Sequence, residues 1–215
     1  MRTSCMRVWT GLTSLVLAST VTWAADGWAT YNSKPGPGNL ISIEGTSTVH
    51  DWRTEGKIIG GKFEAGPGFS TDPAAAKPGK VEAKAQVFLP VRSLKSVKDG
   101  KPYSTSMDDK MYEKLNEKSE KLIRFELVEM VLKEVPESAA EPFLFDTKGK
   151  LTVAGNTKEV AMPVKMKADG KRLEFSGEIA AKMTDFGIEP VSALGGTIKT
   201  GDDIKLGMSW VVQGK

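Results

Sequence analysis

The sequence is poor in the residues that build cross-linked or metal-bound cores. Its 215 residues include one cysteine, Cys5, and one histidine, His50. A single cysteine cannot form a disulfide within the chain, and these two residues cannot supply the four ligands of a structural zinc site. We therefore expect the fold to be held by a hydrophobic core, which a chain of this length can bury.

The sequence also lacks an excess of one charge and lacks long apolar runs. Lysine and arginine number 30 against 27 aspartate and glutamate, a net charge of +3. This balance does not indicate a basic surface for nucleic acid. No apolar run approaches the roughly 20 residues with which a helix spans a bilayer. We expect neither a nucleic-acid partner nor stable membrane insertion.

Residues 1–24 have the layout of a secretory signal peptide. Two arginines precede a short apolar region, and small residues stand at −3 and −1 of a cut after Ala24. The apolar region is too short and too interrupted for a transmembrane anchor. We therefore expect export to the periplasm, followed in the mature chain by a Gly/Pro-rich linker over 25–39.

Alternation of apolar and polar residues dominates the rest of the chain. In 171–185, for example, Leu173, Phe175 and Ile179 fall on one face, and Arg172 and Glu174 on the other. A period of two is typical of strands with one buried face. The segments predicted as strands are 40–52, 55–64, 80–91, 121–133, 144–154, 160–166, 171–185 and 202–213.

One helix is predicted among the strands, over 104–118. Met107, Met111 and Leu115 recur at every fourth position, and residues 106–109 resemble a capping box. The pattern indicates a short amphipathic helix, and we expect it to close one end of the fold.

Eight half-buried strands can form a sandwich or a closed barrel. An antiparallel eight-stranded barrel has no free edges and an interior able to hold one small ligand. The inward residues would be aliphatic, methionine and aromatic, and the irregular segments 64–80 and 186–201 would form its rims. We predict an all-β, eight-stranded antiparallel barrel of residues 40–213.

An apolar lumen favours an apolar guest, because each buried methylene contributes roughly 0.8 kcal/mol. The methionines fit either a plain core or a lumen that adapts to flexible chains, and the sequence does not decide between the two. The residues predicted to face or cap the lumen and bind the ligand are Trp52, Phe63, Val87, Leu89, Met107, Met111, Phe125, Met162, Val164, Phe175, Met183, Phe186, Met208 and Trp210.

The polar residues form no recognised catalytic or metal motif. His50 and Asp51 are adjacent, so their side chains point apart on a strand, and one histidine is too few for a metal site. Residues 185–187 have the Asp-Phe-Gly sequence of the magnesium-binding motif of protein kinases, but no other kinase motif accompanies it. We expect no catalysis, metal or cofactor; an enzyme acting on a lipid-like substrate would have to use His50 with Asp51, or Asp185 with Lys182.

Several segments, taken in order, resemble the YceI-like family over about 40–213. The resemblance implies a lipocalin-like antiparallel barrel, exported to the bacterial periplasm, that binds polyisoprenoid or other long amphiphilic lipids in its lumen. The chain departs from the family pattern at Pro102-Tyr103-Ser104, where some members carry a histidine within an Arg/Asp-rich helix entry. The matching segments are 45–52, 61–63, 106–125, 149–160, 175–177 and 185–188.

Together these features predict an exported barrel that sequesters or carries a long-chain apolar lipid, such as a polyisoprenoid or a quinone-like molecule. The alternative is a solid-cored exported barrel that uses the loops 64–80 and 186–201 to bind a protein or an envelope polymer. The interior volume distinguishes the two, and whether the chain forms a homodimer is left open.

Overall fold

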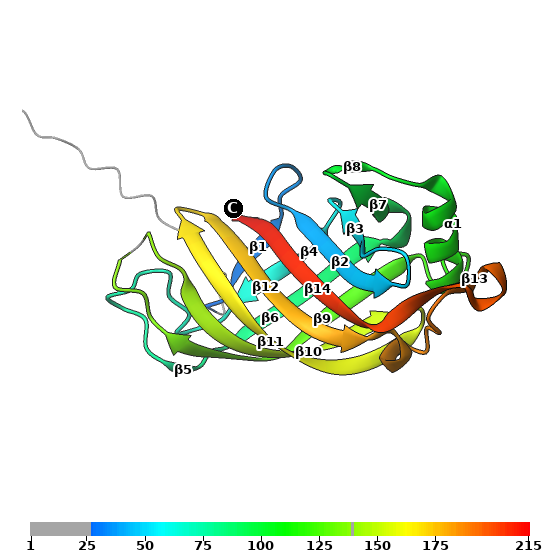
Figure 1. Ribbon diagram of the computed structural model, residues 1–215. Helices are drawn as coiled ribbons and strands as arrows, with labels where there is room; N and C mark the ends of the chain where they lie inside the picture. The colour runs from blue at the N-terminus through cyan, green and yellow to red at the C-terminus, as the bar shows by residue number, and fades with distance from the viewer. Residues whose placement is uncertain (1–26, 139) are drawn as a thin grey trace, which may run out of the picture.

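The computed structural model describes residues 27–138 and 140–215, so the predicted signal peptide lies outside the described residues. The described chain forms one barrel with a short helix at one end (Figure 1). Its elements are β1 (Ala29–Ser33), β2 (Leu40–Ser47), β3 (Trp52–Gly56), β4 (Gly60–Ala65), β5 (Gly79–Lys80), β6 (Ala83–Pro90), η1 (Val91–Ser93), β7 (Lys95–Lys98), β8 (Lys101–Pro102), α1 (Thr105–Lys114), β9 (Leu122–Glu134), β10 (Phe143–Val153), β11 (Asn156–Asp169), β12 (Arg172–Lys182), η2 (Met183–Phe186), β13 (Ser192–Ala193), η3 (Leu194–Gly196) and β14 (Ile198–Gly214).

Six of the strands combine into three long, bent strands. β1 and β2 both pair with β14. β4 pairs with β1 and β3 pairs with β2, while β6 pairs with β4 and β7 pairs with β3. The pairs β1/β2, β3/β4 and β6/β7 therefore each follow one path around the wall, with an irregular break in the middle.

These three paths and β9, β10, β11, β12 and β14 form a closed ring. Each long strand is antiparallel to the next, and the ring closes where β14 meets β1 and β2. The prediction of an all-β, eight-stranded antiparallel barrel with one helix at an end is confirmed. Closure removes the free edges that an open sheet of this size would expose.

The segment predicted as a linker, 25–39, contains the strand β1. Tyr31 pairs with Gly214 on one side and Phe63 on the other, and its side chain is buried. Asn39 holds the break after β1, because its Nδ2 donates to the Lys34 carbonyl (2.7 Å) and its Oδ1 accepts from the backbone N–H of Val211 (2.9 Å). The linker prediction is wrong here because five alternating residues before a Gly/Pro-rich turn give too short a signal.

The helix α1 is shorter than predicted and begins at a different cap. Ser104, not Ser106, is the N-cap, and its hydroxyl accepts from the backbone N–H of Met107 (3.3 Å). Asn116 has a positive φ of 53°, which ends the helix before residue 118. The cap at Ser104 places Asp108 in the first turn, where a carboxylate is favoured by the positive end of the helix.

The anchoring contacts of α1 join it to β7 and η1. The backbone N–H of Ser96 donates to Asp108 (2.7 Å), and Lys95 pairs with the same carboxylate at 3.4 Å. The hydroxyl of Tyr112 donates to the Leu94 carbonyl (2.7 Å). The helix is thereby fixed along one side, with Met107 and Met111 on the side that faces into the barrel.

The half of the barrel away from α1 is solid, and we call it the packed half. Its centre is an aromatic cluster in which the Phe175 ring lies 4.8 Å from Phe63 and 5.7 Å from Trp210 between centroids. Trp210 Nε1 donates to the Ser33 hydroxyl (2.8 Å), so its one polar atom is paired. The buried inward residues of this half include Tyr31, Phe63, Ala65, Phe69, Ala85, Met130, Leu132, Phe143, Phe145, Val164, Met166, Leu173, Phe175, Trp210 and Val212.

Candidate ligand-binding cavity

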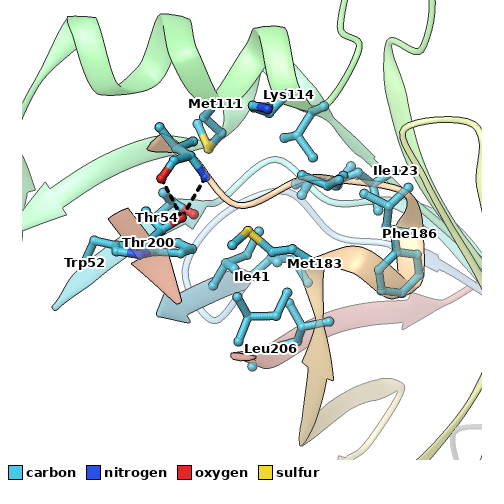
Figure 2. A pocket seen from close by; sticks show the side chains of 18 of the residues that line it. Ile41, Trp52, Thr54, Met111, Lys114, Ile123, Met183, Phe186, Thr200 and Leu206 are labelled. Carbon is cyan, nitrogen blue, oxygen red and sulfur yellow. Dashed lines mark hydrogen bonds between the residues drawn. The ribbon is translucent and has the colours of Figure 1, made fainter. Parts of the chain in front are cut away.

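The other half of the barrel, next to α1, encloses a cavity of about 610 Å³. This volume lies within the roughly 300–1,000 Å³ of small-molecule pockets. Figure 2 shows side chains from the strands, from α1 and from η2 pointing into it. We call this part of the barrel the hollow half.

The wall of the cavity is formed by the inward positions of the same strands that fill the packed half. On β14, Ile204, Leu206 and Met208 line the cavity, while the next inward residue, Trp210, belongs to the packed half. Met208 therefore lies at the floor. The apolar residues of the wall, apart from those named above, include Ile41, Ile43, Trp52, Ile59, Val87, Leu89, Ile123, Phe125, Leu151, Val153, Val160, Met162, Ile179, Met183 and Phe186.

The structure divides the predicted ligand-facing residues between the two halves. Phe63, Val164, Phe175 and Trp210 do not line the cavity, because they fill the packed half. Alternation identifies the inward face but carries no information on how far along the barrel the interior is filled. The predicted residues that line the cavity are Trp52, Val87, Leu89, Met107, Met111, Phe125, Met162, Met183, Phe186 and Met208.

Polar side chains gather at the end of the cavity that lies under α1 and the neighbouring loops. Lys110 and Lys114 of α1 line it, and Lys110 pairs with Glu113 at 2.8 Å. His50 and Tyr103 also line it, with 3.4 Å between the Tyr103 hydroxyl and His50 Nε2. An apolar chamber with a polar mouth is a suitable environment for an amphiphilic molecule.

The mouth lysines and Tyr103 were not among the predicted site residues. Lys110 and Lys114 stand three residues after Met107 and Met111 in the sequence, so they lie beside the apolar face of the helix. That spacing was the feature of the sequence from which a position of these lysines near the cavity could have been predicted. Tyr103 lies outside any periodic segment, and the one feature of the sequence that pointed to it was the departure from the family pattern at residues 102–104.

The two residue pairs considered for catalysis have structural roles. His50 Nδ1 lies 2.7 Å from the Asp51 carbonyl, and both residues are exposed in the turn between β2 and β3. Asp185 accepts from the backbone N–H of Lys182 (3.2 Å) at the start of η2, and Lys182 pairs with Asp203 at 3.1 Å. Within 27–138 and 140–215, no three His, Asp or Glu side chains come together as a metal site.

Two carboxylates that fix the rim of the cavity have lowered pKa values. Asp202 accepts hydrogen bonds from the backbone N–H (2.9 Å) and the hydroxyl (2.7 Å) of Thr184, and these lower the pKa of Asp202. The hydrogen bond from Arg92, with 3.1 Å between nitrogen and oxygen, lowers the pKa of Glu117. Asp202 thereby holds η2, and Glu117 holds the segment after α1 against η1.

We expect stability to fall in acid through these two groups. A carboxyl whose pKa is lower in the folded chain stabilises the fold at pH values above its unfolded pKa of about 4. That contribution disappears as the pH falls through the lower, folded value. Urea unfolding measured at steps from pH 6 to pH 2 should show the loss, and Asp202→Asn should lose less than the unaltered chain. Equally steep losses in both proteins would contradict this role of Asp202.

No helix in the described part of the chain is long and apolar enough to cross a membrane.

Comparison with solved structures supports the fold. The chain is similar to BcnA of Burkholderia cenocepacia, with 16% identity, a TM-score of 0.57, and coverage of 80% of this chain and 94% of BcnA. It is also similar to a polyisoprenoid-binding domain from Saccharophagus degradans implicated in plant cell wall breakdown. That match has 10% identity, a TM-score of 0.58, and coverage of 87% of this chain and 99% of the domain.

A third similar structure is the YceI protein of Campylobacter jejuni, with 16% identity, a TM-score of 0.51, and coverage of 75% of this chain and 84% of that protein. Identities this low show a common fold and no more. No curated protein matches the chain. The family model of the YceI-like domain, however, matches residues 43–212, which is most of the sequence. With a closed barrel and a hollow half already established, this match shows that the chain belongs to the YceI-like family.

Proposed function

We propose that the protein binds one long-chain apolar lipid in the hollow half of its barrel and sequesters or carries it. The observation that carries this proposal is the 610 Å³ cavity, whose wall is mostly apolar, with Lys110 and Lys114 of α1 at one end. Each methylene moved from water into such a wall contributes roughly 0.8 kcal/mol, so a chain of about twenty such groups offsets an association cost of about 4–15 kcal/mol.

The proposed ligand class is a polyisoprenoid or a quinone-like molecule with a prenyl tail. The similar domain from Saccharophagus degradans is a polyisoprenoid-binding domain, which supports this class. The wall also supports it, because its methionine side chains adapt to the irregular outline of a methyl-branched chain. The residues proposed to contact the chain are the predicted ones that line the cavity, from Trp52 to Met208.

We further propose that the mature protein acts in the periplasm, as a binding protein and not as an enzyme. The signal-peptide pattern of residues 1–24 supports the location. The structural roles of His50, Asp51, Lys182 and Asp185 support binding without catalysis. The cavity argues against the alternative of a solid-cored barrel that works only through its loops.

A transfer assay tests the proposal. The chain is stripped of bound lipid, mixed with phosphatidylcholine vesicles that contain a polyprenol, and separated from the vesicles by centrifugation. We expect the polyprenol to appear in the protein fraction and to saturate near one molecule per chain. Vesicles without polyprenol provide the blank. A polyprenol that stays wholly with the vesicles at every protein concentration would refute the function.

A further inference from the structure

Thr54 is a polar side chain in the apolar wall of the cavity. It lies on β3, its side chain is 3% exposed, and it lines the cavity. Its neighbours across the sheet are Ile43 on β2 and Ser96 on β7. Figure 2 shows Thr54 together with Trp52, the preceding inward residue of the same strand, on one wall.

The hydroxyl of Thr54 makes no hydrogen bond to any other described atom of the protein. Other buried hydroxyls do have partners: Ser96 donates to the Ser104 carbonyl (3.0 Å), and Thr147 donates to the Met162 carbonyl (2.7 Å). A buried, unpaired hydroxyl destabilises a fold, and a valine of the same shape would remove that cost. The folded chain therefore has no use of its own for this oxygen.

Other polar groups near Thr54 are already committed to the protein. Trp52 Nε1 donates to the Thr46 carbonyl (3.0 Å), and the Ser47 hydroxyl donates to the His50 carbonyl (2.7 Å). Thr200, which also lines the cavity, accepts from the backbone N–H of Val191 (2.8 Å). The Thr54 hydroxyl is thus an unpaired donor and acceptor in a mostly apolar wall; its oxygen exposes less than 1 Å², so it meets a ligand oxygen only when the side chain turns about χ1.

We propose that Thr54 is a specificity-determining residue that hydrogen-bonds an oxygen of the ligand inside the barrel. This inference rests on the proposed function and narrows it. The ligand is then an apolar chain that carries a hydroxyl or carbonyl oxygen into the cavity. A plain hydrocarbon lacks that oxygen and cannot form this hydrogen bond. Both an isoprenoid alcohol and a prenylated quinone have the required chemistry.

The test compares three probes, geranylgeraniol, a short-chain ubiquinone and squalene, on the unaltered chain, Thr54→Val and Thr54→Ser. Thr54→Val should weaken binding of the oxygen-bearing ligand by roughly 5- to 30-fold, since the ligand oxygen is left unpaired. Squalene affinity should stay within about twofold. Thr54→Ser should bind all three probes as the unaltered chain does. Which oxygenated probe loses affinity identifies the source of the oxygen.

Two controls separate this inference from the proposed function and from damage to the fold. The unfolding temperature of Thr54→Val should equal or exceed that of the unaltered chain, and Thr30→Val, on the exposed outer face of β1, should leave all affinities unchanged. If the unaltered chain binds squalene but Thr54→Val weakens all three probes equally, or none of them, the inference is overturned and the lipid-binding function stands. If no probe binds the unaltered chain, both fail.

Discussion

Replacing Met208 with lysine is expected to abolish lipid uptake. Met208 lies at the floor of the cavity, between Leu206 of the wall and Trp210 of the packed half. An ammonium group at this depth would have to give up its hydration when a lipid chain enters, which costs several kcal/mol. Each 1.4 kcal/mol is tenfold in affinity, so a loss of at least about 100-fold follows. The transfer assay with polyprenol vesicles measures it.

The matched control is Val128→Lys, which introduces the same charge on the outside of the barrel. Val128 lies on β9 and is 53% exposed, so lysine there stays in water. This variant should take up polyprenol as the unaltered chain does, and circular dichroism should show that both variants remain β-barrels. Equal uptake by Met208→Lys and Val128→Lys would mean that the lipid does not occupy the hollow half.

Truncating one leucine in the packed half is expected to destabilise the fold much more than truncating one leucine in the hollow half. Leu173 is fully buried in the packed half, whereas Leu206 borders the cavity. Leu173→Ala should lower the free energy of unfolding by about 2–5 kcal/mol, the usual range for a buried leucine. Leu206→Ala should cost about 1 kcal/mol or less, because its side chain has packing neighbours on fewer sides.

Urea unfolding followed by tryptophan fluorescence measures both losses on ligand-free protein. The same two variants should behave in the opposite way in lipid binding, since Leu206 contacts the ligand and Leu173 does not. Equal losses of stability would show that the two ends of the barrel are packed alike, and the division into a packed half and a hollow half would then be wrong.

Most of the fold could be predicted from the alternation of apolar and polar residues in the strands. Segment 171–185 alternates so regularly that its inward face, Leu173, Phe175 and Ile179, could be assigned directly, and the other seven segments closed the ring. β1 was not predicted, because only Ala29 and Tyr31 mark its inward face before the Gly/Pro-rich turn. Its pairing depends on β14 and β4, which lie far away in the sequence.

The depth of the cavity could not be predicted from the sequence. Phe175 and Ile179 share one face of β12, but Phe175 packs against Trp210 on the neighbouring strand β14 and against Phe63 of β4, whereas Ile179 borders the cavity. Whether an inward side chain fills the lumen depends on what the opposite strands place at the same level. That register comes from closure of the whole ring and not from any one segment.

The polar parts of the site were hidden for a related reason. Nothing in the sequence distinguishes Thr54 from the other threonines. Only the closed barrel shows that its hydroxyl is buried without a partner. Lys114 reads as part of a solvated helix face, and only the placement of α1 on β7 brings it to the mouth of the cavity. Burial and pairing of single polar atoms are tertiary properties.

Native mass spectrometry of the protein, isolated from its producing cells without detergent, tests the central claim most directly. The account predicts a mass equal to the mature polypeptide plus one lipid molecule, and release of that lipid as a prenyl-containing compound on collisional activation. A mass equal to the bare polypeptide, unchanged after incubation with a polyprenol or a prenylated quinone, would contradict the claim that the hollow half is a lipid-binding site.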